Sequence, residues 1–437
     1  MSVCGHTPRA SASARGARGA AVVLAVACTF GGTVRAQSIT YRGFVEGRGV
    51  LFPQDTLGDS RNLVTDGLVR GEVFARSVPW LGLAVGVDLR ANNHDHVEES
   101  WHVDLADRGT LRPRVSIRRL TATISRGPLS IDIGKQFIRW GKADIVNPTD
   151  RFAPRDFLNV IDSELLAVRG ARAVLELGSN TLDAVWVPVF TPSRLPLLNQ
   201  RWTAVESGVD LEAQNEDNAF PRRSQAGVRW GRLGGGHEYS VSFYEGVNHL
   251  PNLVPQLPPS DAPPGAPFVI IFLDHIDVVR RYPSLRMFGG DGAVPTRWFT
   301  AKGEVAYFTS STPTSDEYVL YVAQLERQTG EWLLVGGYAG EVVTARRSSL
   351  MFAPDRGTAR TILGRASYTI DVNRTAAVEA AVRQNGDGLY VKGEYSQARG
   401  QHWRATLTGA LIRGEPDDFL GQYRRNSHVG LSLRYSF

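Results

Sequence analysis

Apolar side chains alternate with small or polar side chains along most of the chain. The last segment shows the pattern up to the final residue, with Val429, Leu431, Leu433, Tyr435 and Phe437 on one face and Gly430, Ser432, Arg434 and Ser436 on the other. A period of two residues is that of a β-strand, whose successive side chains point to opposite faces. The same alternation recurs at 81–90, 376–383 and 389–396. It predicts strands with one apolar and one polar face.

Turn-forming residues divide the chain into segments of this kind. We predict eighteen strands, with sixteen as the alternative, because residues 248–294 can be divided in more than one way. The predicted strands cover residues 39–52, 64–76, 80–92, 112–126, 129–138, 164–176, 181–190, 222–231, 237–247, 280–292, 296–309, 316–327, 331–344, 359–371, 374–384, 387–397, 401–413 and 423–437.

The connections between these strands alternate in length. Short turns such as Val78-Pro79 and Gly127-Pro128 meet at one end, and the other end receives the long connections at about 93–111, 139–163, 191–221 and 248–279. This alternation is typical of transmembrane barrels. A soluble antiparallel sandwich would also have one apolar face and is the alternative. The pattern predicts an all-β fold, a transmembrane antiparallel up-and-down β-barrel of about eighteen strands.

The first 36 residues have the pattern of a secretory signal peptide. Basic residues precede the apolar run Ala20–Phe30, and the small residue Ala36 stands before Gln37. We therefore expect cleavage after Ala36. Residues 37–437 then form one barrel domain.

Cysteine usage and charge narrow the picture further. Cys4 and Cys28, the two cysteines, both lie in the segment expected to be removed, which excludes a disulfide framework in the mature chain. A bacterial lipobox around Cys28, with a lipid on that cysteine, is the alternative to simple cleavage. The formal net charge is +5, but the first 36 residues hold four arginines and no acid, so the remainder is nearly neutral. Nucleic-acid binding needs a concentrated basic stripe, and we expect none.

The polar faces of the strands would line the lumen. A barrel of sixteen to eighteen strands leaves an aqueous channel, and we place more basic than acidic side chains on its inner face. Rings of Arg or Lys favour anions in a pore. The alternative is that these charges pair across strands and only brace the barrel, and a slip of one residue would reverse a strand's faces. The basic positions assigned to the lumen are Arg70, Arg90, Arg118, Arg172, Arg229, Arg286, Lys302, Arg365, Arg383, Lys392, Arg404 and Arg434.

The segment from Gly134 to Glu164 has the most individual sequence. It reads GKQFIRWGKADIVNPTDRFAPRDFLNVIDSE and leads from the fifth predicted strand to the sixth. Its prolines fix turns, and its charged residues can form a dense ion-pair network. The RWGK, NPTD and PRD progression resembles that of a family of porin-like bacterial outer-membrane β-barrels, largely domains of unknown function. The resemblance reaches to about Trp202 and implies movement of molecules across the outer membrane, with no catalytic residues to carry over.

In general porins the loop after the fifth strand folds into the lumen and narrows it. The same arrangement here would place part of the Gly134–Glu164 segment at a constriction. The alternative is that its charges only stiffen an extracellular loop. The candidate pore-lining residues are Arg139, Trp140, Lys142, Asp150, Arg151, Arg155 and Asp156.

The ending SLRYSF, with Phe437 last, resembles the C-terminal strand of bacterial outer-membrane barrels. The barrel-insertion machinery reads that strand as an address. The resemblance implies a location in the outer membrane, with membrane lipid and the insertion machinery as partners. A small-molecule solute is the remaining expected partner.

Candidate chemistry is sparse. His94, His96 and His102 lie near acidic residues and are weak candidates for a divalent ion, but we expect no metal and no other cofactor. Neither G-x-S-x-G nor H-E-x-x-H occurs, so we expect no enzyme. The sequence predicts a porin-like channel for small, anionic solutes. Two alternatives stay open: a gated transporter of hydrophobic molecules such as fatty acids or lipids, in which the apolar run Phe268–Leu273 shapes the site, and a surface scaffold anchored by the barrel.

Overall fold

A computed structural model describes residues 38–437, except 57, 145, 199, 204–209, 216–218, 257–274 and 348–351. The expected signal peptide with Cys28 lies outside the described residues, and so does the apolar run Phe268–Leu273.

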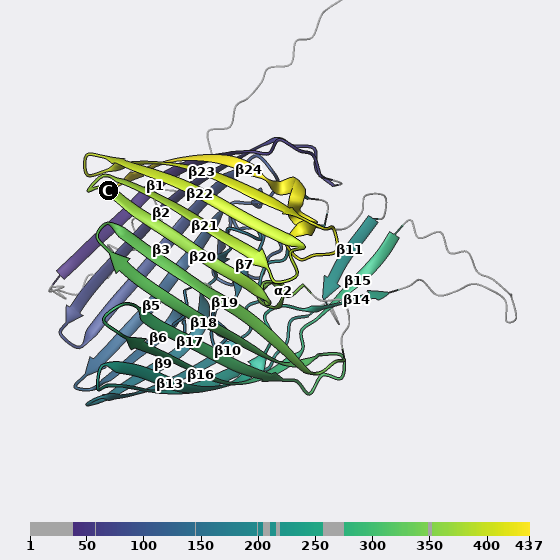
Figure 1. The fold of residues 1–437 in the computed structure, drawn as a ribbon. Coiled ribbons are helices and arrows are strands. Elements are labelled where there is room, and N and C mark those ends of the chain that lie inside the picture. Colours follow the sequence, from purple (N-terminus) through teal and green to yellow (C-terminus); the bar gives the residue numbers. More distant parts are fainter. Residues whose placement is uncertain are drawn as a thin grey trace, which may run out of the picture.

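Within the described residues, eighteen strands form one closed antiparallel sheet (Figure 1). The prediction of eighteen strands is confirmed, and the alternative of sixteen is wrong. The barrel strands in chain order are β1 (Ser38–Leu51), β2 (Leu63–Val78), β3 (Leu81–Asn92), β5 (Val115–Arg126), β6 (Leu129–Gln136), β9 (Val168–Leu177), β10 (Asn180–Val189), β12 (Gln225–Gly234), β13 (His237–Val247), β16 (Ser284–Pro295), β17 (Thr300–Thr309), β18 (Glu317–Thr329), β19 (Trp332–Ala345), β20 (Thr361–Asp371), β21 (Arg374–Arg383), β22 (Gly388–Arg399), β23 (Trp403–Gly414) and β24 (His428–Ser436).

The barrel closes where the last strand meets the first. β24 pairs antiparallel with β1, from Phe44 opposite Ser436 to Leu51 opposite Val429. Beyond β24, the backbone of Phe437 exchanges two 3.0 Å hydrogen bonds with Gly43. Closure satisfies the backbone groups of both edge strands, which hydrocarbon cannot do.

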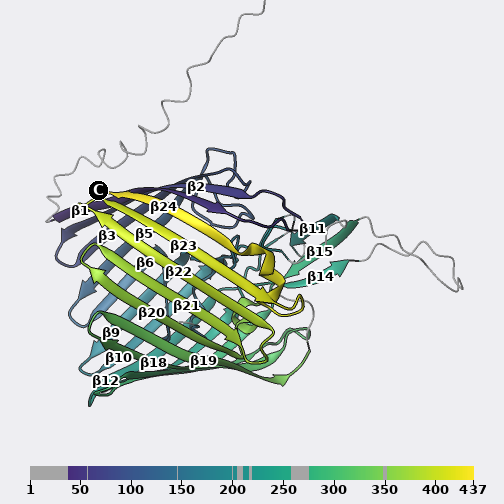
Figure 2. The ribbon, with the colours of Figure 1, turned by 45° about the horizontal axis from the view of Figure 1, so that its top comes forward.

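Connection lengths follow the predicted alternation. Turns of two to four residues join the strands at the end where Phe437 lies, and the long connections emerge at the opposite end. Figure 2 shows the small sheet of β11, β15 and β14 beyond that long-loop end. The short elements of the connections are β4 (Val103–Asp104), β7 (Arg155–Asp156), β8 (Glu164–Leu165), β11 (Asp210–Asn215), β14 (Asn252–Gln256), β15 (His275–Arg281), α2 (Pro354–Gly357) and η3 (Gly421–Asn426).

The outer face of the barrel is apolar and exposed. Leu431 and Leu433 on β24 are 58% and 50% exposed, and equivalent residues follow each strand. An aromatic girdle marks the short-turn end, where tryptophans lie in or beside four of the turns, and such girdles sit at membrane interfaces. In the part of the chain that the structure describes, no helix is long and apolar enough to cross a membrane. The girdle tryptophans are Trp80, Trp298, Trp332 and Trp403.

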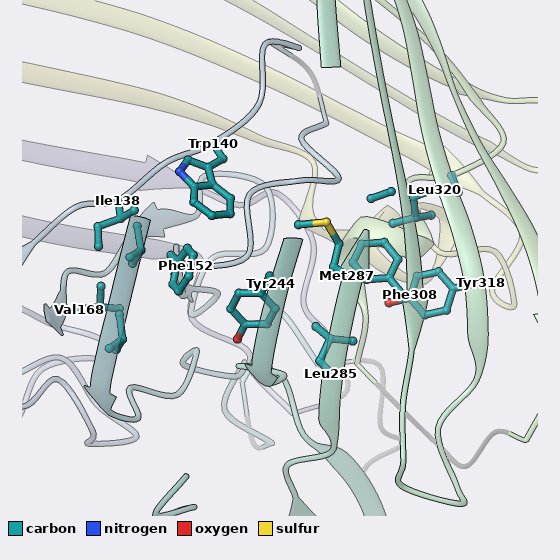
Figure 3. Packing of buried hydrophobic residues seen from close by; sticks show 14 residues of the cluster. Ile138, Trp140, Phe152, Val168, Tyr244, Leu285, Met287, Phe308, Tyr318 and Leu320 are labelled. Carbon is teal, nitrogen blue, oxygen red and sulfur yellow. The ribbon is translucent and has the colours of Figure 1, made fainter. Parts of the chain in front are cut away.

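The largest hydrophobic core lies inside the barrel. Figure 3 shows Trp140 and Phe152 from the connection between β6 and β9 beside Tyr244 of β13, with Met287 of β16 and Phe308 of β17 further along the inner wall. Ring centroids are 5.0 Å apart in both the Trp140–Phe152 and the Phe152–Tyr244 pair, with edge-to-face geometry. Such pairs contribute about 0.5–1.5 kcal/mol beyond their area burial. The connection therefore packs onto the inner wall instead of projecting from the barrel.

Candidate functional site

The connection between β6 and β9, residues 137–167, crosses the interior of the barrel, and we call it the lumenal loop. Residues near its start bond to inward-facing side chains of β10, β13, β17 and β18, while residues near its end bond to β1, β3 and β22. In the order of the sheet, β17 and β1 lie on opposite walls. The loop is therefore fixed at both sides of the lumen.

On the first wall, the carboxylate of Glu304 on β17 anchors the loop. It accepts hydrogen bonds from the backbone N–H groups of Lys142 (3.1 Å), Ala143 (3.2 Å) and Thr149 (2.7 Å), and from the hydroxyl of Thr149 (2.8 Å). Gly141 lies against the same carboxylate with a φ of +94°, and a Cβ there would come within 2.7 Å of its oxygens. Glycine is therefore required at this position.

Ion pairs and one indole extend this anchorage along the same wall. Lys302 Nζ lies 2.7 Å from Asp144, and Lys142 pairs with Glu238 of β13. Trp140 donates from its indole N–H to Asp183 of β10 at 3.0 Å. Lys142 therefore holds the loop to the wall.

On the opposite wall, Asp162 bridges two basic residues. One carboxylate oxygen lies 2.7 Å from Lys392 of β22 and the other 2.7 Å from Arg48 of β1. Burial opposes ionisation of Asp162, but Lys392 and Arg48 outweigh it and lower its pKa to about 2. Glu164, 2.7 Å from Arg90 of β3, behaves in the same way, with Arg90 lowering its pKa to about 2 against the effect of burial.

A buried ionic cluster holds the middle of the loop. Asp156 lies 2.9 Å from Arg112 and 3.0 Å from Arg194, and Arg194 also contacts Asp107, which pairs with Lys135 at 2.6 Å. Burial would raise the pKa of Asp156, but Arg112 and Arg194 hold it well below the usual range. The cluster is closed to solvent, because the side chain of Asp156 is only 3% exposed.

A cavity of about 540 Å³ lies beside the loop. Arg139, Asp150, Arg151 and Arg155, four of the seven residues predicted to line a constriction, border this cavity. Arg139 Nε approaches Asp150 at 3.4 Å, Arg151 pairs with Asp355 of α2 at 3.0 Å, and Arg155 reaches the hydroxyl of Ser163 at 3.4 Å. Burial raises the pKa of Asp150 to about 6, although Arg139, Arg151 and Arg155 oppose that rise. The rest of the lining is mixed. Its apolar residues include Val146, Phe157, Val160, Ile161, Leu165 and Leu285, and its polar residues include Asp144, Asn147, Asn248, His249, Asp355 and Thr358.

Two of the seven predicted constriction residues do not line a channel. Trp140 is 2% exposed within the lumenal core, and Asp156 is enclosed by its arginine partners. Both predictions are wrong for the same reason. The loop needs its own core and its own paired charges to remain folded across the lumen.

Ten of the twelve basic positions assigned to the lumen lie on the inward face of their strands, as the pairing registers show. Arg118 sits at a bulge between β3 and β5 and also faces the interior, where it lines a pocket with Asp88 and Arg90 and its guanidinium lies 4.6 Å from the ring of Phe137. The assignment of Arg286 is wrong, because it points outward beside Glu245 at 3.2 Å. Its neighbour Met287 is fully buried toward the lumenal core, which makes the apolar side of β16 the inner one at this point. The ten are Arg70, Arg90, Arg172, Arg229, Lys302, Arg365, Arg383, Lys392, Arg404 and Arg434.

Acidic partners that the sequence reasoning missed offset many of these charges. Arg172 pairs with Asp183, Arg229 with Asp291, Lys302 with Glu326 and Arg434 with Glu46. The predicted excess of basic residues was therefore overstated. The alternating pattern could have placed some of these acids in the lumen, because Glu46 and Asp183 occupy polar positions of the first and seventh predicted strands.

A second cavity, of about 380 Å³, lies beside β1, β22, β23 and β24. Four basic residues border it, Arg48, Lys392, Arg404 and Arg434, against three acids, Glu46, Asp162 and Glu394. Arg404 is exposed and has no hydrogen-bond or ion-pair partner among the described residues. Hydroxyl groups complete the lining, from Ser396, Thr406, Thr408 and Ser432.

The three candidate metal-binding histidines are not brought together. His94 pairs with Asp59 at 2.6 Å, and His96 packs edge-on against it with a pKa lowered to about 4, by burial first and then by Arg112. His102 lies apart and contacts Ser100 at 2.8 Å. Among the described residues, no group of three His, Cys, Asp or Glu side chains is arranged to hold a metal ion.

Comparisons with known proteins concern the fold. No family model matches the chain, and no curated protein matches it. The outer membrane protein opdK from Pseudomonas aeruginosa is 9% identical with a TM-score of 0.52, covering 91% of this chain and 98% of its own. OccAB4 from Acinetobacter baumannii is 8% identical with a TM-score of 0.52, covering 93% and 100%.

A BenF-like porin from Pseudomonas fluorescens Pf-5 is 9% identical, with a TM-score of 0.52 and coverage of 92% and 98%. At these identities the likeness is one of fold. Together with the closed sheet, the apolar outer face and the aromatic girdle, it defines the class of this protein as a multi-pass β-barrel of the bacterial outer membrane.

Proposed function

We propose that the protein is a porin-like channel through which small solutes cross the outer membrane, with a preference for anions. The fold supports a channel, because a closed barrel of eighteen strands is wide enough to leave water in its lumen. The lumenal loop supports a selective one. It crosses between opposite walls and leaves cavities of about 540 and 380 Å³ beside it.

The observation that carries the anion preference is the charge around the smaller cavity. Four basic residues face three acidic ones there, and Arg404 is exposed with no counter-ion among the described residues. Of the other three basic residues, Arg48 and Lys392 share Asp162, and Arg434 pairs with Glu46. A basic lining lowers the free energy of an anion inside a pore relative to a cation. Because the other three basic residues of this cavity are paired, the preference rests mainly on Arg404.

Partners follow from the same proposal. Outer-membrane lipid contacts the apolar outer face, and the insertion machinery engages the last strand, which ends at Phe437. Membership of the porin-like family of domains of unknown function rests on the RWGK, NPTD and PRD progression. In this structure those segments include Trp140, Thr149 and Asp156, which anchor the lumenal loop. No described side chain is assigned a catalytic role.

The reversal potential of the channel across a KCl gradient tests this proposal. The mature chain is refolded in detergent and inserted into a planar bilayer. We expect a reversal potential of the sign set by chloride, because the basic lining admits chloride more readily than potassium. A reversal potential set by potassium would contradict the anion preference, and bilayers that stay silent with correctly folded protein would contradict the channel.

A further inference from the structure

The ion bridge at Asp162 is formed between the lumenal loop and two separate strands. Arg48 projects from β1 and Lys392 from β22, and β24 and β23 lie between these strands in the sheet. Each oxygen of the Asp162 carboxylate meets one of the two cations at 2.7 Å. The two side chains thus make a binding place for one oxyanion, and the chain's own carboxylate occupies it.

A local turn presents this carboxylate. The side-chain oxygen of Asn159 accepts hydrogen bonds from the backbone N–H groups of Ile161 (3.1 Å) and Asp162 (3.0 Å). Such an Asx turn fixes the backbone without help from the Asp162 side chain. The Glu304 anchor on the far wall is also independent of Asp162. Release of the carboxylate would leave the loop in place.

The bridge can be reached from the lumen. The side chains of Asp162 and Lys392 are each 19% exposed and that of Arg48 is 29% exposed, whereas those of the Asp156–Arg194 pair are 3% exposed. The 380 Å³ cavity lies directly against the bridge, and Arg404, which has no partner among the residues that the structure describes, borders the same cavity. A small anion in this cavity would meet a cation and hydroxyl donors before it reached the bridge.

We propose that Arg48 and Lys392 form a binding subsite for the oxyanionic group of a permeating solute, and that Asp162 occupies this subsite until a solute displaces it. The inference rests on the proposed function. It adds where the anion binds, at Arg48 and Lys392, and which group of the chain competes with it, the Asp162 carboxylate. When the solute's oxyanionic group replaces the Asp162 carboxylate, both Arg48 and Lys392 keep an anionic partner. The exchange therefore avoids the free-energy cost of leaving a cation unpaired in a partly buried site. The freed Asp162 turns to the water of the cavity.

Block of the chloride current by inorganic phosphate tests the subsite. Asp162→Asn removes the competing charge and keeps the shape of the side chain. We expect the phosphate concentration for half-maximal block to fall roughly three- to fivefold, the factor that an exposed ion pair represents. Adding Arg48→Gln to Asp162→Asn should raise it again, because one of the two cations is then missing.

Glu164→Gln is the matched control, since it removes one negative charge from the same loop. Its partner Arg90 keeps Asp88 at 3.2 Å, so no cation is freed. We expect less than about half of the shift seen for Asp162→Asn. Equal shifts in both variants would overturn the subsite in favour of a general charge effect.

The two proposals can fail separately. An anion-selective wild-type channel with unchanged phosphate block in Asp162→Asn overturns the subsite alone. A folded wild-type protein that is cation-selective or silent overturns the proposed function. If Asp162→Asn does not fold, Asp162→Glu serves instead. This variant keeps the negative charge on a longer side chain. If the subsite exists, phosphate should block its chloride current no more readily than it blocks the wild-type current.

Discussion

Glu304 accepts both the backbone N–H and the hydroxyl of Thr149, at 2.7 and 2.8 Å, across the interior of the barrel. The carboxylate belongs to a wall strand and the threonine to the lumenal loop. Two further N–H groups of the loop converge on it. Among the described residues, this contact is the most highly bonded of the wall anchors that hold the loop across the lumen.

Replacement of Glu304 should widen the channel. Glu304→Ala leaves four donors of the loop without their acceptor, at a cost of about 1–3 kcal/mol for each one that stays buried. We expect a larger single-channel conductance with more frequent fluctuations. Glu379→Gln is the control, because Glu379 also faces the lumen but bonds Tyr390 of β22 and not the loop. Equal conductance and equal noise in the two variants would contradict the role of Glu304 as an anchor.

Gly141 should tolerate no side chain. Its φ of +94° and its closeness to the Glu304 carboxylate make Gly141→Ala strained by about 1–3 kcal/mol. We expect the same noisy, enlarged conductance as for Glu304→Ala. Gly393→Ala provides the comparison, since nothing lies within 4 Å of a Cβ built there. A quiet channel of wild-type conductance in Gly141→Ala would contradict the anchor geometry.

Arg404 and Arg286 should differ in their effect on selectivity. Arg404 faces the smaller cavity with no partner in the described part of the chain, whereas Arg286 lies on the outer face beside Glu245. Arg404→Gln should lower the chloride-to-potassium permeability ratio by roughly a factor of two, because one lumenal cation is lost. Arg286→Gln should leave the ratio unchanged. The reversal potentials of both variants test this difference. A larger loss of anion selectivity in Arg286→Gln than in Arg404→Gln would mean that Arg286 faces the lumen.

Selectivity should depend on pH through Asp150. Its pKa is raised to about 6 by burial, against the opposing effect of Arg139, Arg151 and Arg155. Between pH 7.5 and 5 the carboxyl takes up a proton and the larger cavity becomes more positive. We therefore expect anion selectivity to increase on acidification over this range. Asp162 and Glu164, whose pKa values are lowered to about 2, stay ionised throughout.

The raised pKa of Asp150 also predicts how the stability of the protein changes with pH. A carboxyl whose pKa is higher in the folded chain than in the unfolded chain binds its proton more tightly when folded. Asp150 therefore makes the protein more stable as the pH falls from about 7 to about 4. Asp150→Asn should abolish this contribution and the pH dependence of selectivity together. A reversal potential that changes equally with pH in wild type and Asp150→Asn would assign the effect to another group.

Much of the barrel could be predicted from the sequence. Lipid on one side and water on the other impose a period of two on each strand, and this pattern placed all eighteen strands. It fails where a strand meets protein on its inner side. At Arg286 the inward neighbours Leu285 and Met287 are apolar because they pack against the lumenal core, so the polar residue faces outward.

The candidate site was predicted less completely. The sequence indicated the lumenal loop as a structured segment, because its prolines and charges lie close together in the chain. It could not indicate which charges are paired, because Glu304, Asp355 and Lys392 come from strands and connections far away in sequence. Trp140 shows the same limit, since its burial depends on Asp183 and Phe152 and not on its own neighbours in the chain.

The single-channel conductance of the mature wild-type protein tests the account most directly. The protein is inserted into a planar bilayer in KCl, beside a variant in which a short Gly-Ser linker replaces residues 139–163. We predict stable unitary steps for the wild type and steps several-fold larger for the variant, because the loop occupies much of the lumen. Equal conductances would contradict a constriction by the loop, and a silent wild-type protein that is folded would contradict the channel itself.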